Sequence, residues 1–461
     1  MQILSVTGGA PLYGTVPIHG AKNSVLPILA AAVLCRSPCV LHNCPQIEDV
    51  DTALEILKCL GCRSERRGGS LFVDASGMDG CEIPVELAGK MRSSIVFLGP
   101  VLARRGKARL ALPGGCPLGA RPIDLHLMAL RAMGAEVEME GGHVCAKAQT
   151  LAPAKIALPF PSVGATENAM LAATGCTGCT EIWNAAREPE IVDLAGFLRS
   201  AGAEISGAGG GHITVCGGAP LHGTTYTVLP DRIETATYLC AAAACGGDVT
   251  LRQASAETCR PLIALLRGSG CTIEERHDVL RISCAGRLKA LERVTTGPYP
   301  GFPTDAQAPL MAARLRAEGR TEFVETIFEN RLRHAEQLRK MGADIRVDGR
   351  KAVVTGVERL NGAELLAEDL RGGAALVIAA LSAEGKSSVS GVKHIKRGYD
   401  RLEENLKSLG ADIKTVEISG AFVYNKPIRG SARRRDTAVR RARKKVPVRA
   451  GKEQIHEHTR T

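Results

Sequence analysis

One cysteine stands in a stretch that a protein core could not use. Residues 112–126 read LPGGCPLGARPIDLH, which places Cys116 among glycines and prolines and five residues before Arg121. A nearby cation lowers the pKa of a thiol and suits it to proton transfer. We therefore expect a mobile, exposed loop with a catalytic cysteine; a small buried thiol is the alternative that the residues alone leave open.

Charged residues gather where Ala-rich apolar segments begin. These starts read GAKNS (20–24), GKMRSS (89–94), GATENA (164–169), DRIETA (231–236), PTDAQA (303–308) and DLRGGA (369–374). Helix N-termini offer free N–H groups and a partial positive charge, which suits phosphates and carboxylates. Basic residues at these starts or on the loops between them are Lys22, Arg92, Arg121, Arg331, Arg371 and Arg397. The alternative to an anion-binding cleft is that these helix starts are polar only because they are exposed. Six such starts with the carboxylates Asp305 and Asp369 among them disfavour that alternative.

A sixfold repeat would position these groups. A helical stretch ends six times in glycine, a small residue and a strand-forming residue, at Gly61, Gly134, Gly202, Gly270, Gly342 and Gly410. A glycine just past a helix end favours the left-handed turn that stops the helix. Each unit also has an earlier Ala-rich helix, which is apolar on most sides and expected to be buried. Two strands joined by a Gly-rich turn complete a βαβαββ-like unit.

A longer repeat divides the chain. VTGGAPLYGT (6–15) returns as VCGGAPLHGT (215–224), and this shift of 209 residues equals the distance from Gly61 to Gly270. The fold class is therefore predicted as α/β, with two domains of three units each. We expect one domain at 22–229, carrying the Cys116 loop, and a second formed by 1–21 and 230–425. The two crossings, near residues 20 and 230, would suit hinge closure over a cleft.

The net charge of +11 is concentrated in the last residues. Residues 427–461 hold 12 Lys and Arg against 3 Asp and Glu, a net +9, which leaves +2 for the rest of the chain. Such a segment has too few apolar residues to order itself, so 426–461 is expected to be a basic disordered tail. Contact between this tail and nucleic acid is an alternative function, but only 3% of the residues are aromatic and the body offers no base-stacking pattern.

The sixteen cysteines are expected to be reduced thiols of a cytoplasmic protein. We see neither a signal sequence nor an apolar run long enough to span a membrane. Cys59/Cys62 and Cys176/Cys179 have the CxxC spacing of metal or redox sites, but the repeat explains their positions. No metal and no cofactor are therefore expected, and His126 and His394 are interpreted as structural.

The motifs together resemble one enzyme family. The stretches GAKNSVLP, KMRSSIVFLGP, LPGGCPLGARPIDLH, SVGATENAM, PDRIETAT, GFPTDAQAPL, ETIFENRLRHAEQLRKMGADI, DLRGGAALVIAAL and IKRGYDRLEENLKSLGADI are similar to those of the UDP-N-acetylglucosamine enolpyruvyltransferases, over about residues 1–425. The resemblance implies two inside-out α/β barrels. It also implies transfer of the enolpyruvyl group of phosphoenolpyruvate to the sugar 3-hydroxyl of UDP-N-acetylglucosamine, with release of phosphate, at the start of peptidoglycan precursor synthesis.

The resemblance also assigns roles to residues. Cys116 matches the proton donor, which can form a covalent phosphoenolpyruvate adduct and is the target of fosfomycin. Asp305 matches a general base, although from the residues alone it could cap the helix that follows. Lys22, Arg121 and Arg397 match contacts to phosphoenolpyruvate. The matches to nucleotide-sugar contacts are Asn23, Arg92, Arg121, Pro122, Ile123, Asp124, Leu125, Ser162, Val163, Gly164 and Ile327, and Arg331, Asp369 and Arg371 line the same cleft. Phe160 and Pro161 stand where some members have lysine, so this chain departs from the family pattern at a uridine-side contact.

Two other readings remain. The shikimate-using enolpyruvyltransferases share the fold but lack the PGGC loop, which is intact here. An inactive paralogue is disfavoured because the charged matches are otherwise present.

Overall fold

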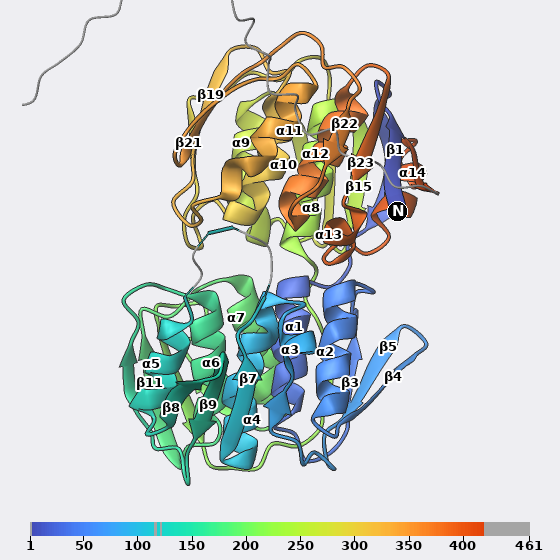
Figure 1. Cartoon of the computed structure of the whole chain (residues 1–461). Coiled ribbons are helices and arrows are strands. Elements are labelled where there is room, and N and C mark those ends of the chain that lie inside the picture. Colours follow the sequence, from blue (N-terminus) through green and yellow to red (C-terminus); the bar gives the residue numbers. More distant parts are fainter. Residues whose placement is uncertain (1, 115–117, 120–121, 419–461) are drawn as a thin grey trace, which may run out of the picture. The chain divides into compact units, whose positions relative to one another are not determined.

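Six four-stranded sheets of one design build the described part of the chain (Figure 1). The computed structural model describes residues 2–114, 118–119 and 122–418. In the sheet ordered β10-β11-β13-β12, the first pair is parallel and the other two pairs are antiparallel. This is the arrangement that a βαβαββ unit produces, and the other sheets repeat it. The predicted α/β repeat is confirmed.

Three of the sheets belong to the first half of the chain. The first sheet is ordered β14 (Thr225–Thr227), β3 (Cys39–His42), β5 (Ser70–Asp74) and β4 (Arg63–Arg67). The second is ordered β6 (Glu82–Ile83), β7 (Lys107–Ala111), β9 (His143–Lys147) and β8 (Glu136–Glu140). The third is ordered β10 (Lys155–Ala157), β11 (Gly178–Trp183), β13 (His212–Gly217) and β12 (Glu204–Ser206).

The other three belong to the second half. The first sheet is ordered β2 (Leu12–Pro17), β15 (Gly247–Arg252), β17 (Val279–Cys284) and β16 (Thr272–Arg276). The second is ordered β18 (Arg293–Thr295), β19 (Arg320–Val324), β21 (Lys351–Thr355) and β20 (Asp344–Asp348). The third is ordered β22 (Glu364–Leu366), β23 (Lys386–Ser390), β1 (Gln2–Thr7) and β24 (Asp412–Glu417).

Strands from the 209-residue repeat complete sheets far away in sequence. β1 pairs with β23 and β24, and β2 pairs in parallel with β15, so the N-terminal strands lie in second-half sheets. β14 follows the second copy of the repeat, late in the first half, and pairs with β3 near the beginning of that half. The chain thus crosses between the halves after β2 and again after β14.

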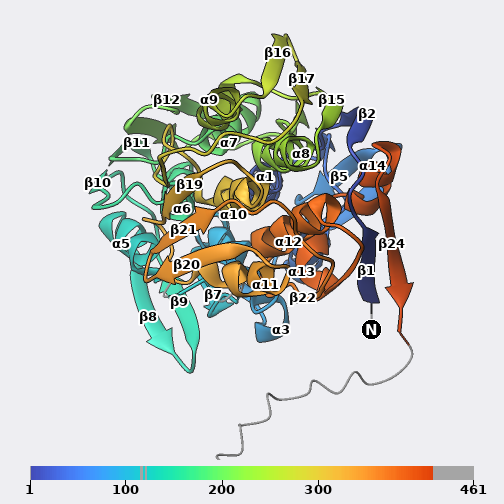
Figure 2. The same cartoon turned by 90° about the horizontal axis from the view of Figure 1, so that it is seen from above.

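Each half has a set of inner helices with sheets around them. Figure 2 shows α8, α10 and α12 surrounded by the second-half sheets, and these three helices contact one another. The inner helices are α1 (Lys22–Ala32), η1 (Arg92–Phe97) with α4 (Leu98–Arg105), α6 (Val163–Ala173), α8 (Arg232–Cys245), α10 (Thr304–Arg314) and α12 (Leu370–Ser382). Every residue of α12 is buried, because small alanine and glycine side chains let neighbours approach on all sides. The helices inside and strands outside agree with the inside-out barrels that the resemblance implied.

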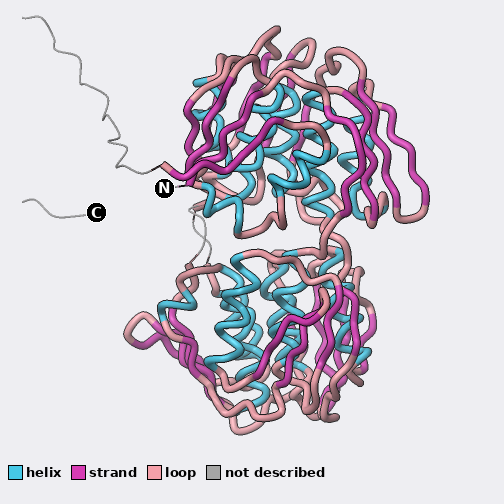
Figure 3. Tube along the Cα trace, turned by 90° about the vertical axis from the view of Figure 1, so that its right-hand side faces the viewer, coloured by secondary structure: helices cyan, strands magenta, loops and turns pink. Residues whose placement is uncertain are grey.

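Outer and connecting helices complete the units. The outer set is α2 (Glu48–Cys59), α5 (Asp124–Ala132), α7 (Pro189–Ser200), α9 (Arg260–Gly268), α11 (His334–Lys340) and α14 (Leu402–Ser408). The short connecting turns are α3 (Val85–Ala88), η2 (Glu257–Cys259), η3 (Arg331–Arg333) and α13 (Val392–Lys396). Figure 3 shows strands and helices in separate layers. Within the described ranges, no helix is both long and apolar enough to cross a membrane.

The buried apolar side chains form two cores. One core includes residues between Val25 and Val228, and the other joins Leu4–Ile18 to residues between Ala236 and Ile413. By backbone contacts, residues 1–418 form one compact unit. The domain limits 22–229 and 1–21 with 230–425 stay a prediction that the two cores support. The predicted tail lies outside the described residues from residue 419 onward.

Two cysteines depart from the prediction of reduced thiols. Cys179 in β11 and Cys216 in β13 stand directly opposite each other and form a disulfide. The expectation was wrong for this pair because pairing of the two strands, which sequence spacing does not reveal, brings the side chains together. Cys176, the other member of the CxxC motif, remains a free buried thiol.

Candidate active site

A cavity of about 600 Å³ is lined by the starts of the inner helices. Of the residues predicted for the site, it is lined by Lys22, Asn23, Arg92, Pro122, Asp124, Leu125, Ser162, Val163, Gly164, Asp305, Ile327, Arg331, Asp369, Arg371 and Arg397. Ile123 is not part of the lining and packs against the first core instead. Cys116 and Arg121 lie outside the described residues.

A buried carboxylate holds two of the predicted cations. Asp49, in the first turn of α2, accepts Lys22 Nζ at 2.7 Å and Arg397 Nε at 2.8 Å. Burial alone would raise the pKa of Asp49, but the two cations outweigh it and the pKa lies below its ordinary value. Burial lowers the pKa of Lys22, although Asp49 acts in the opposite direction. Asp49 was not predicted from the sequence, because no motif marks it.

A second carboxylate, Asp305, faces the cavity. Its oxygens lie 2.6 Å from Arg331 Nη2 and 3.4 Å from Arg371 Nη2, and 26% of its side chain is exposed. Burial opposes ionisation, but Arg371, Arg331, Arg232 and Lys22 together hold the pKa of Asp305 well below its usual range. Its alternative role as an N-cap is wrong, because Pro303 occupies the N-cap position of α10 and Asp305 lies in the first turn.

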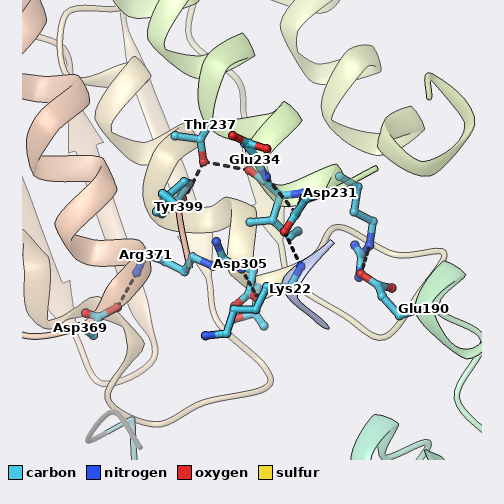
Figure 4. A network of polar contacts seen from close by, with 12 residues as sticks. Lys22, Glu190, Asp231, Glu234, Thr237, Asp305, Asp369, Arg371 and Tyr399 are labelled. Carbon is cyan, nitrogen blue, oxygen red and sulfur yellow. Dashed lines mark hydrogen bonds and ion pairs between the residues drawn. The ribbon is translucent and has the colours of Figure 1, made fainter. Parts of the chain in front are cut away.

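The start of α12 fixes Arg371. Asp369 is a true N-cap, with Oδ1 accepting the backbone N–H groups of Arg371 at 3.1 Å and Gly372 at 2.9 Å (Figure 4). The Arg371 guanidinium lies over the Tyr399 ring, 5.3 Å from its centroid, and Tyr399 in turn hydrogen-bonds Thr237 at 2.9 Å. The Asp369 cap therefore fixes the backbone of Arg371, and Tyr399 fixes its guanidinium beside Asp305.

The two crossings of the chain meet beside Lys22. Ala21 N donates to Leu229 O and Asp231 N donates to His19 O, both at 2.8 Å. Asp231 caps α8 and also accepts the Lys22 backbone N–H at 3.1 Å. A side chain on Gly20 would collide with the Asn43 carbonyl oxygen, only 1.7 Å from the ideal Cβ position. Glycine at 20 is needed for this close approach.

A cluster of glutamates on the cavity wall was also missed. Glu190 Oε1 lies 2.9 Å from Arg232 Nε, and Glu188 accepts the Tyr299 backbone N–H at 3.3 Å. Burial and the other two carboxylates raise the pKa of Glu167 well above its usual value. The sequence EPE at the start of α7 was an available signal, since acids favour helix N-termini.

The start of α6 offers backbone donors to the cavity. Ser162 caps the helix, its hydroxyl accepting the Ala165 N–H at 3.4 Å, and Val163 and Gly164 follow in the first turn. Phe160, at which the chain departs from the family pattern, lines the same cavity with 45% of its surface exposed. Among the described residues, no His, Cys, Asp and Glu side chains form a group suited to a metal ion.

Comparison with known proteins decides the family. A profile described as EPSP synthase (3-phosphoshikimate 1-carboxyvinyltransferase) matches residues 6–406. The chain belongs to the EPSP synthase family. Two curated relatives, both from Caldanaerobacter subterraneus subsp. tengcongensis, are named UDP-N-acetylglucosamine 1-carboxyvinyltransferase 2 and 1. The first is 50% identical over 90% of this chain and 100% of its own length, and the second is 48% identical over 87% and 97%.

Solved structures of an enolpyruvyl transferase and of an EPSP synthase share this architecture. The enolpyruvyl transferase NikO from Streptomyces tendae matches with a TM-score of 0.81 and 28% identity, over 90% of this chain and 98% of that one. An EPSP synthase from Acinetobacter baumannii matches with a TM-score of 0.69 and 20% identity, over 90% of this chain and all of that one, which shows the fold alone.

Proposed function

We propose that the chain transfers the enolpyruvyl group of phosphoenolpyruvate to the 3-hydroxyl of UDP-N-acetylglucosamine and releases phosphate. The two relatives named for this reaction, which match almost the whole chain at about half identity, carry the proposal. The product is a precursor of peptidoglycan, so the enzyme serves cell-wall synthesis, cell shape and division. A cytoplasmic location is part of the same proposal.

Lys22 and Arg397 are proposed to bind phosphoenolpyruvate. Both line the cavity and both are oriented by Asp49, so their cationic groups are preorganised rather than gathered when the substrate arrives. Phosphoenolpyruvate carries a phosphate and a carboxylate, and fixed cations recognise each of these groups. Arg121 matches a third contact of this kind.

Asp305 is proposed to take the proton of the sugar hydroxyl. While it is paired with Arg331 and Arg371 its low pKa makes it a weak base. An anionic substrate that competes for the two guanidinium groups would weaken both pairs and raise this pKa. The site thus couples substrate binding to activation of the base.

The reaction is proposed to follow addition and elimination. The sugar oxygen attacks C2 of phosphoenolpyruvate, its proton passes to Asp305, and C3 takes a proton from the Cys116 thiol. The tetrahedral intermediate then loses a proton from C3 and breaks the C2–O bond to phosphate, which restores the double bond. Stabilisation by the surrounding cations offsets the charge that develops on the leaving phosphate.

The nucleotide sugar is proposed to lie against the start of α6. Backbone N–H groups at a helix N-terminus bind phosphate oxygens, and the first turn at Ser162–Gly164 lines the cavity. The remaining proposed contacts are Asn23, Arg92, Pro122, Ile123, Asp124, Leu125 and Ile327. Of these, Ile123 does not line the cavity.

Phosphate release tests the proposal. The full chain is incubated with phosphoenolpyruvate and either UDP-N-acetylglucosamine or shikimate 3-phosphate as acceptor. We expect rapid release with the nucleotide sugar and none above background with the shikimate ester. Release with the shikimate ester instead would replace this function with that of the other branch of the family.

A thiol-labelling experiment tests the role of Cys116. The epoxide phosphonate fosfomycin should label this residue alone, and Cys116→Ser should lose labelling. Cys59 is the sensitive control, because it is the exposed free thiol of the described region. Label found on Cys59 or spread over several cysteines would overturn the assignment.

A further inference from the structure

His126 is a buried histidine in the cavity wall that the reaction described above does not use. It lies in the first turns of α5, is only 7% exposed, and lines the cavity together with Arg92 and Gly164. Interpreted from the sequence as structural, it has one ring nitrogen with an obvious structural partner. The other ring nitrogen is the subject of the inference.

Asn168 determines which ring nitrogen carries the proton. This side chain is fully buried in α6, and its Oδ1 accepts the Gly99 backbone N–H at 2.7 Å. Its Nδ2 donates to Ile95 O at 2.8 Å and lies 2.9 Å from His126 Nδ1. The two backbone groups fix the orientation of the amide, so Nδ2 faces His126 as a donor. His126 Nδ1 must then be the acceptor, and the proton resides on Nε2.

The Nε2–H group lies against the first turn of α6. A Cβ built on Gly164 would be 3.2 Å from His126 Nε2 and 2.9 Å from Cε1, so only glycine leaves the ring its place. Among the described residues, Nε2 has no hydrogen-bond partner, and it is not one of the fully buried polar atoms, so it is open to the cavity that His126 lines. A donor that faces the cavity can meet an acceptor on a ligand there, and a hydrogen bond to a charged acceptor is stronger than one to a neutral group.

We propose that His126 is a neutral hydrogen-bond donor to the diphosphate of the nucleotide sugar, with Asn168 as the residue that positions it. The inference rests on the proposed function, which places that diphosphate at the start of α6. Nε2–H, the backbone N–H groups of the helix start and Arg92 then act on one anion from three elements.

Neutrality is what lets this ring lie beside a cation. Burial, with a smaller contribution from Arg92, lowers the pKa of His126 to about 3. Protonation of Nδ1 would also place two donors face to face at Asn168. The ring therefore stays a neutral donor at physiological pH, and binding of the diphosphate through it takes up no proton.

A matched pair of variants tests the contact. His126→Gln can place an amide N–H where Nε2 was, whereas His126→Asn is too short to reach it but can still meet Asn168. Binding of UDP-N-acetylglucosamine, without phosphoenolpyruvate, is measured by calorimetry on the full chain. We expect His126→Asn to weaken binding about tenfold, as for loss of a hydrogen bond to a charged group, with His126→Gln much closer to wild type.

The other substrate separates binding from folding. The KM for phosphoenolpyruvate should be nearly unchanged in both variants, and thermal unfolding identifies a variant that is merely destabilised. Equal affinity for the nucleotide sugar in wild type and folded His126→Asn would overturn the inference while leaving the proposed function intact. A wild-type chain that neither binds UDP-N-acetylglucosamine nor releases phosphate would instead overturn the proposed function and this inference with it.

Nitrogen NMR tests the tautomer independently of the variants. With ¹⁵N-labelled histidine in the full chain, the His126 signals, assigned by their loss in His126→Gln, should show a protonated Nε2 and an unprotonated Nδ1 between pH 6 and 8. Addition of UDP-N-acetylglucosamine should shift the Nε2 signal. A protonated Nδ1, or no response to the nucleotide sugar, would contradict the proposal.

Discussion

Asp49 and Asp305 are two carboxylates with nearly the same charge environment and different access to the cavity. Each binds two cations, Lys22 and Arg397 for the first and Arg331 and Arg371 for the second. Yet the Asp49 side chain is 4% exposed and that of Asp305 is 26% exposed. Charge alone therefore does not distinguish an acid that positions cations from one that can meet a substrate.

The difference arises from the helices that carry them. Asp49 is in the first turn of an outer helix, α2, and its side chain is almost fully buried although it borders the cavity. Asp305 is in the first turn of an inner helix, α10, whose start lines the cavity. We infer that Asp49 acts through Lys22 and Arg397, while Asp305 acts on the substrate. The predictions below test that contrast.

The largest effect is expected at the accessible acid. Asp305→Ala should lower kcat by about 10²–10⁴-fold, the contribution of a general base, while binding of UDP-N-acetylglucosamine changes little. Phosphate release and calorimetry measure the two quantities. Near-normal turnover would remove the base assignment, and Asp305→Asn, which retains the shape but not the charge, is the matched control.

Asp49→Asn should affect stability more than Asp305→Asn does. Removal of one partner from a buried ion pair leaves an uncompensated charge, with a loss of about 3 kcal/mol in the free energy of unfolding. The pKa of Asp49 is lowered in the folded state, so this stability is present above about pH 4 and is lost as the pH falls further. Denaturant unfolding at pH 7 and at low pH measures both; equal losses for the two variants would break the comparison.

The pH dependence of phosphoenolpyruvate binding should also respond to Asp49. Burial lowers the pKa of Lys22 and Asp49 raises it, so removing Asp49 lowers it further. Lys22 must be charged to bind an anion, and the rise of KM at alkaline pH should begin at lower pH in Asp49→Asn. A profile that coincides with wild type would show that Lys22 does not contact the substrate.

The smallest effect is expected at Asp369. Asp369→Ala should lower the free energy of unfolding by about 1 kcal/mol through loss of the α12 cap, whereas Asp369→Asn should change it little because asparagine also caps helices. Turnover should fall only modestly, because Tyr399 still holds the Arg371 side chain that faces Asp305. A loss as large as that of Asp305→Ala would mean that Asp369 acts directly on the substrate.

Much of the fold could be predicted because each unit of the repeat is marked by short-range sequence patterns. Gly61 and its five counterparts end helices, and the Ala-rich segments are apolar on most sides, so element types follow from period and composition. The cations of the site were found for the same reason, since Lys22, Arg92 and Arg371 stand at recognisable helix starts.

The partners of those cations depend on contacts between residues far apart in sequence. Asp49 and Arg397 are separated by 348 positions, and Asn168 and His126 by 42, with no local pattern that joins them. The disulfide between Cys179 and Cys216 likewise depends on strand pairing.

Residue types and their periodicity determined which elements form and where charge gathers, because those preferences act over a few residues. Which carboxylate is buried, which histidine nitrogen keeps its proton and which thiols meet were decided by tertiary structure alone, because burial and hydrogen bonding depend on neighbours that only packing brings together.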